Sequence, residues 1–439
     1  MTLVAGDGVD TIGPIRKAWG MTETTSTGTE LDGILLSLFM TQEGKADPYP
    51  AYARLREATP LHRTPMGFAV MTRYADCYDT LRDNRLGHGD QAFDPSVMGI
   101  SRDEFHERFP RLPERPESML QLDPPDHTRL RGLVAKAFTP RAIERLRPRI
   151  QELTDDLLSS LEGEVDVVPA IALKLPITVI GEMLGVPGED HAALLPHIRV
   201  IIRSLGPNLA GGIDQFAEIY EASNVIDDYF RQLVAQKRAQ PADDMLTELI
   251  QAEEAGDRLN EGELLATITL LFVAGYETTT NLIGNGLRAL LLHPDQLERL
   301  RQDRSLIKSA VEEMLRYDSP VQLTARVVLQ DGVSINGVDL AKGDQVITLL
   351  GSANRDPRTF EEPDRFDIAR QGASPLSFSA GIHYCLGASL ARTEGQVVFG
   401  ALLDHYPSIE PAWSDQEPLR YRDNVVLRGL ESLPVHLGR

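Results

Sequence analysis

Cysteine is scarce in this chain, with two residues among 439. Cys77 and Cys385 are far apart in the sequence and do not have the spacing of metal ligands, so a cysteine-built metal module is not indicated. Chains with so little cysteine are suited to a reducing compartment. We therefore expect a cytoplasmic protein.

Long apolar runs are also missing. The longest apolar-dominated run, Leu264–Gly275, has twelve residues and contains two threonines. That is shorter than the ~18 residues that a membrane-spanning helix requires. The N-terminus has no basic region followed by an apolar stretch, so no signal peptide is apparent. We expect a soluble protein without a membrane partner.

Positive charge is in deficit, because 44 Lys and Arg residues face 65 Asp and Glu residues and the formal net charge is −21. A surface of this charge repels nucleic acid and anionic lipid, which argues against both as partners. The length allows a large core, and the composition is that of an ordinary globular protein. Residues 1–33 are rich in Gly, Thr and Asp and predict a disordered leader ahead of the folded part, residues 34–439.

One stretch near the C-terminus stands out, Phe378–Arg392, with the sequence FSAGIHYCLGASLAR. Cys385 lies between Gly381 and Gly387, and because glycine has no Cβ, the backbone of such a loop can approach another group closely. The residues that follow read as a helix. The free N–H groups and the dipole at a helix N-terminus favour a cysteine thiolate, which is the form that binds iron. The alternative is a buried core cysteine without chemistry.

The same window resembles the haem-binding loop of the cytochromes P450, F-x-x-G-x-H-x-C-x-G followed by A-R. The resemblance implies that Cys385 is the axial ligand of the iron of haem b, within a loop formed by the two glycines. It also implies that His383 hydrogen-bonds a haem propionate and that Phe378 packs over the sulfur. The chain departs from the family pattern at Ser379, where many members have glycine in the turn over the haem.

Two further segments match the family's propionate-binding positions. The segment from Leu122 to Pro140 predicts a helix opened by a proline pair, and His127 and Arg131 lie four residues apart, hence on one face. From the residues alone, a solvated polar face explains this pair as well. The resemblance implies instead that both side chains, together with Arg326, hold haem propionates.

A long, mostly hydrophobic helix is predicted to begin at a capping box formed by Asn260 and Glu263 and to end at His293-Pro294. A helix that is apolar on most faces runs through the middle of a protein.

The centre of that helix carries the sequence AGYETT from Ala274 to Thr279. Gly275 weakens the helix by about 1 kcal/mol relative to alanine, and Thr278 can bond back to a carbonyl one turn earlier. The segment resembles the family's A-G-x-E/D-T-T motif, which implies that Thr278 holds dioxygen and its water and that Glu277 helps to relay protons. The alternative is a threonine-rich kink with a glutamate at the surface.

The resemblance also implies a substrate pocket beside the haem. Its candidate lining residues are Leu271, Ala274, Val321, Leu323, Val426 and Leu427. The segments Leu86–Leu120 and Leu205–Gly212 resemble the roof and the mobile lid of that pocket. Four residues near the lid are weaker candidates, for which core packing is an equally good explanation: Ile201, Ile202, Leu205 and Leu209. An apolar lining predicts a lipophilic substrate such as a fatty acid, terpenoid, steroid or polyketide.

Several signals concern the scaffold. Glu313 and Arg316 form an E-x-x-R pair, which alone indicates little because such pairs are common on exposed helices. Combined with PDRF, which contains Arg365, it resembles the family's Glu-Arg-Arg triad, a structural lock on the haem side. Asn336-Gly337 predicts a hairpin turn, so a small sheet accompanies the helices. Cys77 falls on the face of an amphipathic helix and is expected to be a core residue.

The acidity of the chain is reversed between Arg129 and Arg149, where one acid, Glu144, accompanies seven basic residues: Arg129, Arg131, Lys136, Arg141, Arg145, Arg147 and Arg149. We hypothesise that this segment is the docking patch for an acidic electron donor, whose encounter it would accelerate. The chain contains no flavin or iron–sulfur motif, so we expect separate donors, a ferredoxin and a ferredoxin reductase.

The resemblance extends from about Asp47 to the end of the chain. It implies one large, mainly helical haem domain with a small β region, and we expect a monomer. The implied activity is that of a monooxygenase, which inserts one oxygen atom of O2 into a lipophilic substrate. A peroxygenase on the same fold and a non-catalytic haem or ligand-binding protein remain as alternatives. The Glu277 and Thr278 pair argues against these two alternatives, because neither activity needs a proton relay.

Overall fold

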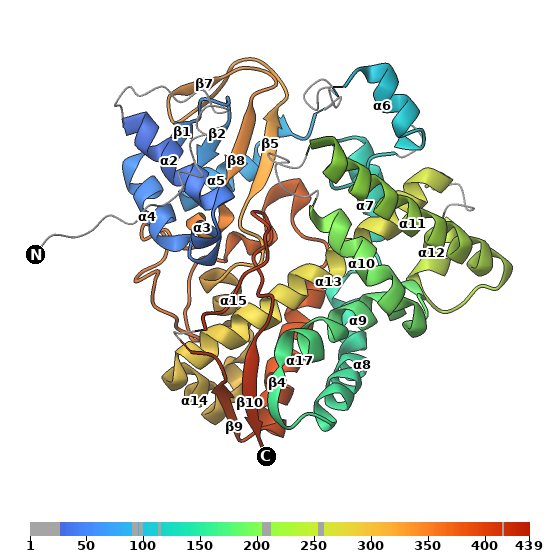
Figure 1. Cartoon of the computed structure of the whole chain (residues 1–439), viewed down its shortest axis with the longest axis vertical. Coiled ribbons are helices and arrows are strands. Elements are labelled where there is room, and N and C mark those ends of the chain that lie inside the picture. The colour runs from blue at the N-terminus through green and yellow to red at the C-terminus, as the bar shows by residue number, and fades with distance from the viewer. Residues whose placement is uncertain are drawn as a thin grey trace, which may run out of the picture.

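The computed structural model describes residues 27–89, 95, 100–112, 116–203, 212–252, 259–414 and 417–439. Most of these residues are helical, and helices far apart in the sequence surround one long central helix (Figure 1). The α-helices are α2 (Thr27–Met40), α3 (Gln42–Ala46), α4 (Tyr49–Ala58), α5 (Tyr74–Arg82), α6 (Arg102–Arg108), α7 (Asp126–Val134), α8 (Pro140–Ser159), α9 (Lys174–Leu184), α10 (His191–Ile202), α11 (Gly212–Ala239), α12 (Met245–Ala252), α13 (Glu261–Leu292), α14 (Pro294–Gln302), α15 (Ile307–Tyr317), α16 (Leu350–Ala353) and α17 (Ala388–His405).

The strands are short and gather mainly at one end of the molecule and at the C-terminus (Figure 1). They are β1 (Leu61–Arg63), β2 (Ala69–Met71), β3 (Leu86–Gly87), β4 (Gly163–Asp166), β5 (Thr324–Val328), β6 (Val333–Ile335), β7 (Val338–Leu340), β8 (Gln345–Thr348), β9 (Ser408–Pro411) and β10 (Pro434–Gly438). The predicted class, mainly helical with a small β region, is confirmed.

The 32-residue helix α13 crosses the middle of the molecule. It opens with the predicted capping box, in which the Asn260 side chain accepts from the Glu263 N–H and the Glu263 side chain accepts from the Asn260 N–H. It ends at Leu292, directly before His293 and Pro294. Because α9, α11, α15 and α17 pack around it, side chains on most of its faces are buried.

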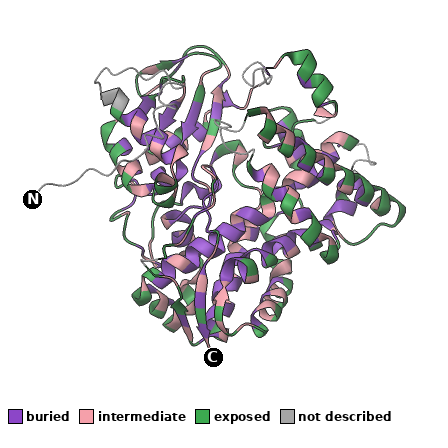
Figure 2. Cartoon of the chain, viewed as in Figure 1, coloured by how far each residue is buried: buried purple, intermediate pink, exposed green. Residues whose placement is uncertain are grey.

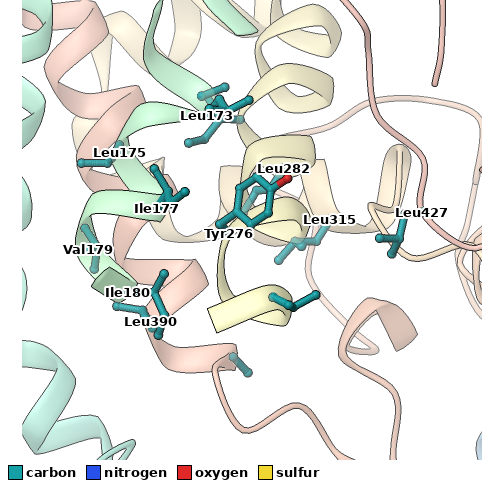
Figure 3. Close-up of a cluster of buried hydrophobic side chains, with 14 of the residues drawn as sticks. Leu173, Leu175, Ile177, Val179, Ile180, Tyr276, Leu282, Leu315, Leu390 and Leu427 are labelled. Carbon is teal, nitrogen blue, oxygen red and sulfur yellow. The ribbon is translucent and has the colours of Figure 1, made fainter. Parts of the chain in front are cut away.

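The main hydrophobic core is built around α13 (Figure 2). Figure 3 shows part of it, where leucine and isoleucine side chains of α9 lie near Tyr276 and Leu282 of α13, with Leu390 of α17 beside them. The core therefore holds α13 and α17 in a fixed relation. These are the two helices that carry the AGYETT and cysteine-loop motifs.

A five-stranded sheet with the order β1-β2-β8-β5-β3 forms the largest β unit. Strands β2 and β8 are parallel, and the other neighbours are antiparallel. Strands β6 and β7 form the predicted hairpin, in which Asn336 and Gly337 have φ values of 52° and 76°. Positive φ at both central residues is the signature of a type I′ turn. A three-stranded sheet, β4-β10-β9, ties the C-terminus to the segment after α8.

Some predicted boundaries differ from the structure. Helix α2 begins at Thr27 and buries Leu31, so the last part of the predicted leader, residues 1–33, is helical; residues 1–26 lie outside the described residues. The irregular segment Leu86–Leu120 contains the short helix α6. The helix predicted over Leu122–Pro140 is shorter in the structure, where α7 covers Asp126–Val134 and Thr139 caps the start of the next helix, α8, at Pro140.

Among the described residues, no helix combines the length and the hydropathy needed to cross a bilayer. Cys77 lies on α5 with 0% exposure, which confirms the prediction that it is a core residue.

Candidate functional site

The cysteine loop runs from Phe378 to the start of α17 and is closed by a backbone hydrogen bond of 2.9 Å from the Cys385 N–H to the Phe378 carbonyl. Gly381 is required in this loop, because its φ is 70° and a Cβ would lie 2.3 Å from the carbonyl oxygen of Leu81. At Gly387 a Cβ would meet no described atom, so that glycine makes no close approach to the protein itself. Cys385 is exposed, which rules out the alternative of a buried core cysteine.

The acidity of the Cys385 thiol differs from the prediction. The Gly387 N–H donates to the sulfur, and Arg131 and Arg392 add positive charge, all of which lower the pKa as expected at a helix N-terminus. Surrounding protein atoms nevertheless desolvate the sulfur more strongly, so the net effect is a raised pKa although one side of the residue is exposed. Within the protein alone, burial of the sulfur therefore outweighs the helix N-terminus and the two arginines, whereas coordination to a metal deprotonates a thiol.

Ser379 has a backbone conformation of φ 61° and ψ −163°, which is a region populated almost only by glycine. Its hydroxyl oxygen is buried and has no hydrogen-bond partner among the described residues. The family resemblance pointed to glycine at this position. The structure explains why glycine suits it and shows that serine is strained there.

Two arginines, Arg392 and Arg131, hold the cysteine loop against the rest of the protein. Phe378 is buried, and the Arg392 guanidinium lies 4.4 Å from the centre of its ring. Arg392 is paired with Glu312 of α15. Arg131 of α7 donates to the carbonyl oxygen of Tyr384, which fixes α7 against the loop. The predicted residues Arg131, Phe378 and Cys385 thus come together in space.

His383 of the loop lies between two other imidazoles. Its ring centre is 4.3 Å from that of His127 on α7 and 4.7 Å from that of His88, which follows β3. We call these three residues the imidazole cluster. The sequence pattern did not point to His88, because a single histidine after a two-residue strand carries no motif or periodicity.

His127 is buried and His88 and His383 are half-buried, yet most of the ring nitrogens of the imidazole cluster lie out of contact with solvent. Four of its ring nitrogens, His88 Nε2, His127 Nδ1, His127 Nε2 and His383 Nε2, have no hydrogen-bond partner within the described part of the chain. Burial, followed by the nearby charge of Arg326, lowers the pKa of His383 to about 2 and that of His88 to about 4. Burial also lowers the pKa of His127.

Arg326 on β5 is the cation beside this cluster, and 4% of it is exposed. Its Nη1 donates to the Thr324 hydroxyl at 3.2 Å and to the Ala325 carbonyl at 2.7 Å, and no carboxylate of the described residues forms an ion pair with it. Burial lowers its pKa to about 10. A buried guanidinium with several unsatisfied imidazole nitrogens around it is complementary to an anionic acceptor, and the carboxylates of a haem are such acceptors. The residues present fit that group.

The centre of α13 is open on one side. Ala274 is exposed, although Val273 and Tyr276 beside it are buried. The Thr278 hydroxyl donates to the Ala274 carbonyl at 3.2 Å, which is the predicted bond to the preceding turn. An exposed alanine in a helix packed on its other faces marks a space against which a ligand can lie.

Glu277, the residue before Thr278, is 5% exposed. It forms an ion pair with Arg422 of the segment before β10. A surface glutamate, the alternative left open by the sequence, is therefore wrong. Arg422 could not be found from the sequence, because it lies 145 residues away and has no motif of its own.

The candidate pocket residues are mostly part of the main core. Leu271, Leu323, Val426 and Leu427 have exposures of 7%, 4%, 9% and 5%. Val321 is half-buried and forms an isolated β-bridge with Leu427, so the two segments that carry these residues lie side by side. Of the weaker candidates, Ile202 is buried and Ile201 is half-buried, whereas Leu205 and Leu209 lie outside the described residues.

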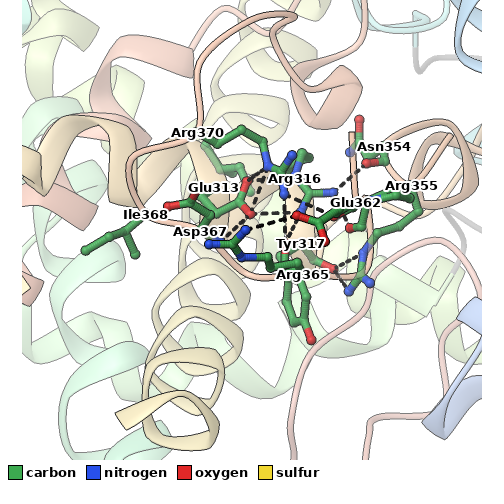
Figure 4. Close-up of polar contacts among 12 residues, drawn as sticks. Glu313, Arg316, Tyr317, Asn354, Arg355, Glu362, Arg365, Asp367, Ile368 and Arg370 are labelled. Atoms are coloured by element: carbon green, nitrogen blue, oxygen red, sulfur yellow. Dashed lines mark hydrogen bonds and ion pairs between the residues drawn. The ribbon is translucent and has the colours of Figure 1, made fainter. Parts of the chain in front are cut away.

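The predicted triad is corrected by the structure (Figure 4). Arg316 donates both Nε and Nη2 to Glu313, at 2.7 and 2.8 Å, and both residues are buried. The third member is Arg370, whose Nε lies 3.1 and 3.2 Å from the Glu313 carboxylate oxygens. The Arg365 side chain instead pairs with Glu362 and is 58% exposed, so that only its carbonyl oxygen joins the group. We call Glu313, Arg316 and Arg370 the scaffold network.

The basic segment is partly neutralised. Arg129 pairs with Glu263, Arg147 with Glu144, and Arg149 with Glu152 and Glu182. The residues that are exposed and have no ion pair with a described residue are Lys136, Arg141 and Arg145. The predicted patch is therefore smaller than the sequence indicated.

Comparison with known proteins identifies relatives that cover most of the chain. The family model described as Cytochrome P450 matches residues 211–431. Cytochrome P450 107B1 of Saccharopolyspora erythraea is 45% identical over 402 residues, which are 89% of this chain and 95% of that protein. Vitamin D(3) 25-hydroxylase of Pseudonocardia autotrophica is 40% identical over 426 residues, 94% of this chain and 98% of that protein. Among solved structures, the myxobacterial cytochrome P450 CYP267B1 in complex with myristic acid has a TM-score of 0.82 at 36% identity and covers 92% of this chain and 99% of that one.

Proposed function

Because the chain belongs to the cytochrome P450 family, it is a monooxygenase that binds haem b through a cysteine thiolate, and we propose that Cys385 is that cysteine and that the enzyme hydroxylates a lipophilic small molecule. The observation that carries the assignment is the contrast between the two cysteines. Cys77 is 0% exposed in the core, where a haem cannot reach its sulfur. Cys385 is exposed, accepts from a helix N-terminus and lies beside two arginines.

The haem carboxylates are held, in this proposal, by His127, Arg131, His383 and Arg326. The unsatisfied nitrogens of the two histidines support this assignment, as does the buried guanidinium of Arg326. Burying a polar group without a partner costs roughly 1–3 kcal/mol, which a bound carboxylate would offset. Phe378 and Gly381 shape the loop around the sulfur. Because Gly387 has no Cβ, it leaves room for the haem at the start of α17.

The bound haem would supply the oxygen chemistry, in which dioxygen, two electrons and two protons give insertion of one oxygen atom into a C–H bond and release of the other as water. The chain's part is to deliver protons and to position the substrate. The Thr278 hydroxyl, on the open side of α13, can release the Ala274 carbonyl and hold a proton-carrying water at its Oγ1. Glu277 is held by Arg422, so its carboxylate must part from that guanidinium before it can pass a proton to Thr278.

The proposed substrate class follows from the residues proposed to line the substrate pocket. Leu271, Ala274, Val321, Leu323, Val426 and Leu427 present apolar groups, which favour a lipophilic molecule. Ala274 has the smallest side chain of the set and stands at the open side of α13, so it leaves space where the substrate C–H bond would lie. Relatives act on or bind molecules of this kind, since one is named a vitamin D(3) hydroxylase and another was solved with myristic acid.

The family uses separate electron-transfer partners, and a ferredoxin with its reductase is the proposed source of electrons for a monomeric enzyme. Lys136, Arg141 and Arg145 form the remaining basic patch, near the start of α8, to which an acidic electron donor would bind.

Reversing Arg141 and Arg145 to glutamate should slow reduction of the haem iron by the donor and weaken the salt dependence of that rate. Lys342→Glu, an exposed reversal between β7 and β8, is the control. Unchanged reduction kinetics in the double variant would contradict the docking role.

The decisive experiment for the function combines spectroscopy and turnover. The reduced carbon monoxide complex of the wild-type protein should show the thiolate absorbance, and Cys385→Ser should abolish it while Cys77→Ser retains it. A spectral binding screen of lipophilic compounds identifies substrates for turnover with O2 and a ferredoxin system. Turnover with peroxide alone, at the same rate as with O2 and reductant, would favour the peroxygenase alternative.

Thr278→Ala tests the proton role. This variant should consume reductant but release peroxide in place of product, because the hydroxyl that holds the proton-carrying water is gone. Thr279→Ala, at the buried neighbouring position, is the matched control. Full coupling of reductant use to product formation in Thr278→Ala would refute the role given to Thr278.

A further inference from the structure

We propose that His88 is a further haem-binding residue, which donates a hydrogen bond to a haem carboxylate and is positioned for this by Asp123. The inference rests on the proposed function, because it assumes that the imidazole cluster faces the haem carboxylates. It adds a binding residue from a different part of the chain, the segment after β3, to those on α7, β5 and the cysteine loop.

The placement of His88 supports this role. Its ring meets that of His383 edge to face, with centres 4.7 Å apart and an interplanar angle of 79°. His127 meets the same ring at 4.3 Å and 50°. The two histidines thus contact one partner ring, and His88 shares the surroundings of a residue already assigned to the carboxylates.

Asp123 holds the backbone on which His88 is mounted. Its carboxylate oxygens accept from the His88 N–H at 3.0 Å and from the Gly89 N–H at 2.8 Å. The fit is close, because a Cβ at Gly87 would lie 2.2 Å from Asp123 Oδ1. Asp123 lies four residues before His127, whose N–H donates to the Asp123 carbonyl at 3.0 Å. One residue therefore sets the positions of both flanking histidines.

The chemistry of the cluster points to an acceptor. His88 Nε2 is buried and has no partner among the described residues, like the nitrogens of His127 and His383. A metal ion is not the partner, because no group of three or more His, Cys, Asp or Glu among the described residues is arranged to hold one. Burial keeps His88 neutral near pH 7, and a neutral imidazole protonated on Nε2 is a hydrogen-bond donor. With Arg326 close by, a carboxylate is the group that satisfies the cluster.

The test measures haem retention by the holoenzyme, as the rate of haem transfer to excess apomyoglobin. His88→Leu should lose haem about tenfold or more faster than wild type, which is the usual effect of deleting a hydrogen bond to a charged group. His88→Gln should stay close to wild type, because its amide nitrogen reaches the place of Nε2. His88→Asn, which is also polar but one carbon shorter, should behave like His88→Leu. His436→Leu, at an exposed strand position, is the control.

The same measurement separates positioning from general structure. Asp123→Asn should speed haem loss by less than His88→Leu, and the double variant should lose haem no faster than His88→Leu alone, because Asp123 acts through His88. Additive effects would mean that Asp123 acts independently and would overturn its role as a positioning residue.

Two outcomes overturn the assignment of His88. One is wild-type haem retention in both His88→Leu and His88→Asn. The other is equal haem loss in His88→Gln and His88→Asn, which would indicate a packing role without a donor. If His88→Leu does not fold, the Gln and Asn pair still decides the question. Failure of the proposed function has a different signature, because the wild-type protein would then lack the thiolate absorbance.

Discussion

The scaffold network and the imidazole cluster are both polar and both largely buried, yet only the scaffold network is complete within the chain. Arg316 uses all five of its N–H groups: two bind Glu313, and three bind the carbonyls of Asn354, Pro363 and Arg365 at 2.7–3.2 Å. The imidazole cluster has four ring nitrogens without a partner in the described part of the chain. Satisfied polar groups stabilise a fold, whereas unsatisfied ones cost free energy unless a ligand completes them.

This contrast separates a structural role from a binding role without reference to motifs. Substitutions in the scaffold network should act on the fold itself. Substitutions in the imidazole cluster should act mainly on the haem. The following experiments test that division.

Removing the central arginine should have the largest effect. Arg316→Met leaves the Glu313 carboxylate buried with Arg370 as its remaining cation, and breaking a buried pair costs roughly 3–5 kcal/mol. Denaturant unfolding of the holoenzyme measures the loss. Arg54→Met, which breaks an ion pair whose side chains are 59% and 63% exposed, should cost no more than about 1 kcal/mol. Equal effects at the two sites would contradict the structural role of the network.

The corrected third member can be tested by a matched pair. Arg370→Leu removes a 15% exposed side chain that binds Glu313 and should lower the free energy of unfolding by about 2–3 kcal/mol. Arg365→Leu removes an exposed side chain paired with Glu362 and should change it by less than about 1 kcal/mol. A larger loss of unfolding free energy in Arg365→Leu than in Arg370→Leu would instead identify Arg365 as the third member of the network.

The stability of the fold at acidic pH should depend on the imidazole cluster. Burial lowers the pKa of His88 to about 4 in the folded state, below the value of about 6.5 in an unfolded chain. Between these values the unfolded state binds more protons, so stability is full above pH ~6.5 and falls as the pH drops toward about 4. Each such histidine contributes at most about 1.4 kcal/mol per pH unit. His88→Gln should flatten this slope in haem-free protein followed by denaturant unfolding, and an unchanged slope would contradict the burial argument.

The smallest expected effect concerns the strained loop. Ser379→Gly should raise the free energy of unfolding by about 1 kcal/mol, because glycine adopts φ 61°, ψ −163° without strain and removes a buried hydroxyl that lacks a partner. Asn336→Gly in the β6–β7 turn is the control, since asparagine tolerates its φ of 52° and should gain nothing. Thermal unfolding compares the two, and a loss of stability in Ser379→Gly would show that the hydroxyl has an unseen role.

Local patterns were enough for the features that depend on neighbouring residues. The capping box at Asn260, the end of α13 before Pro294, the Asn336-Gly337 turn and the burial of Cys77 were all predicted correctly. Each depends on backbone sterics, side-chain capping or periodicity within a few residues, which any fold must respect. The cysteine-loop motif likewise identified the family, which the comparisons confirm.

Contacts between distant segments were beyond reach of such patterns. Nothing in PDRF distinguishes Arg365 from Arg370, because the choice depends on which guanidinium the folded chain brings to Glu313. The partner of Glu277, the proximity of His88 to His383 and the balance that raises the pKa of Cys385 were decided in the same way. Burial and Coulomb interactions depend on distance in space, and that distance is set only when the whole core has packed.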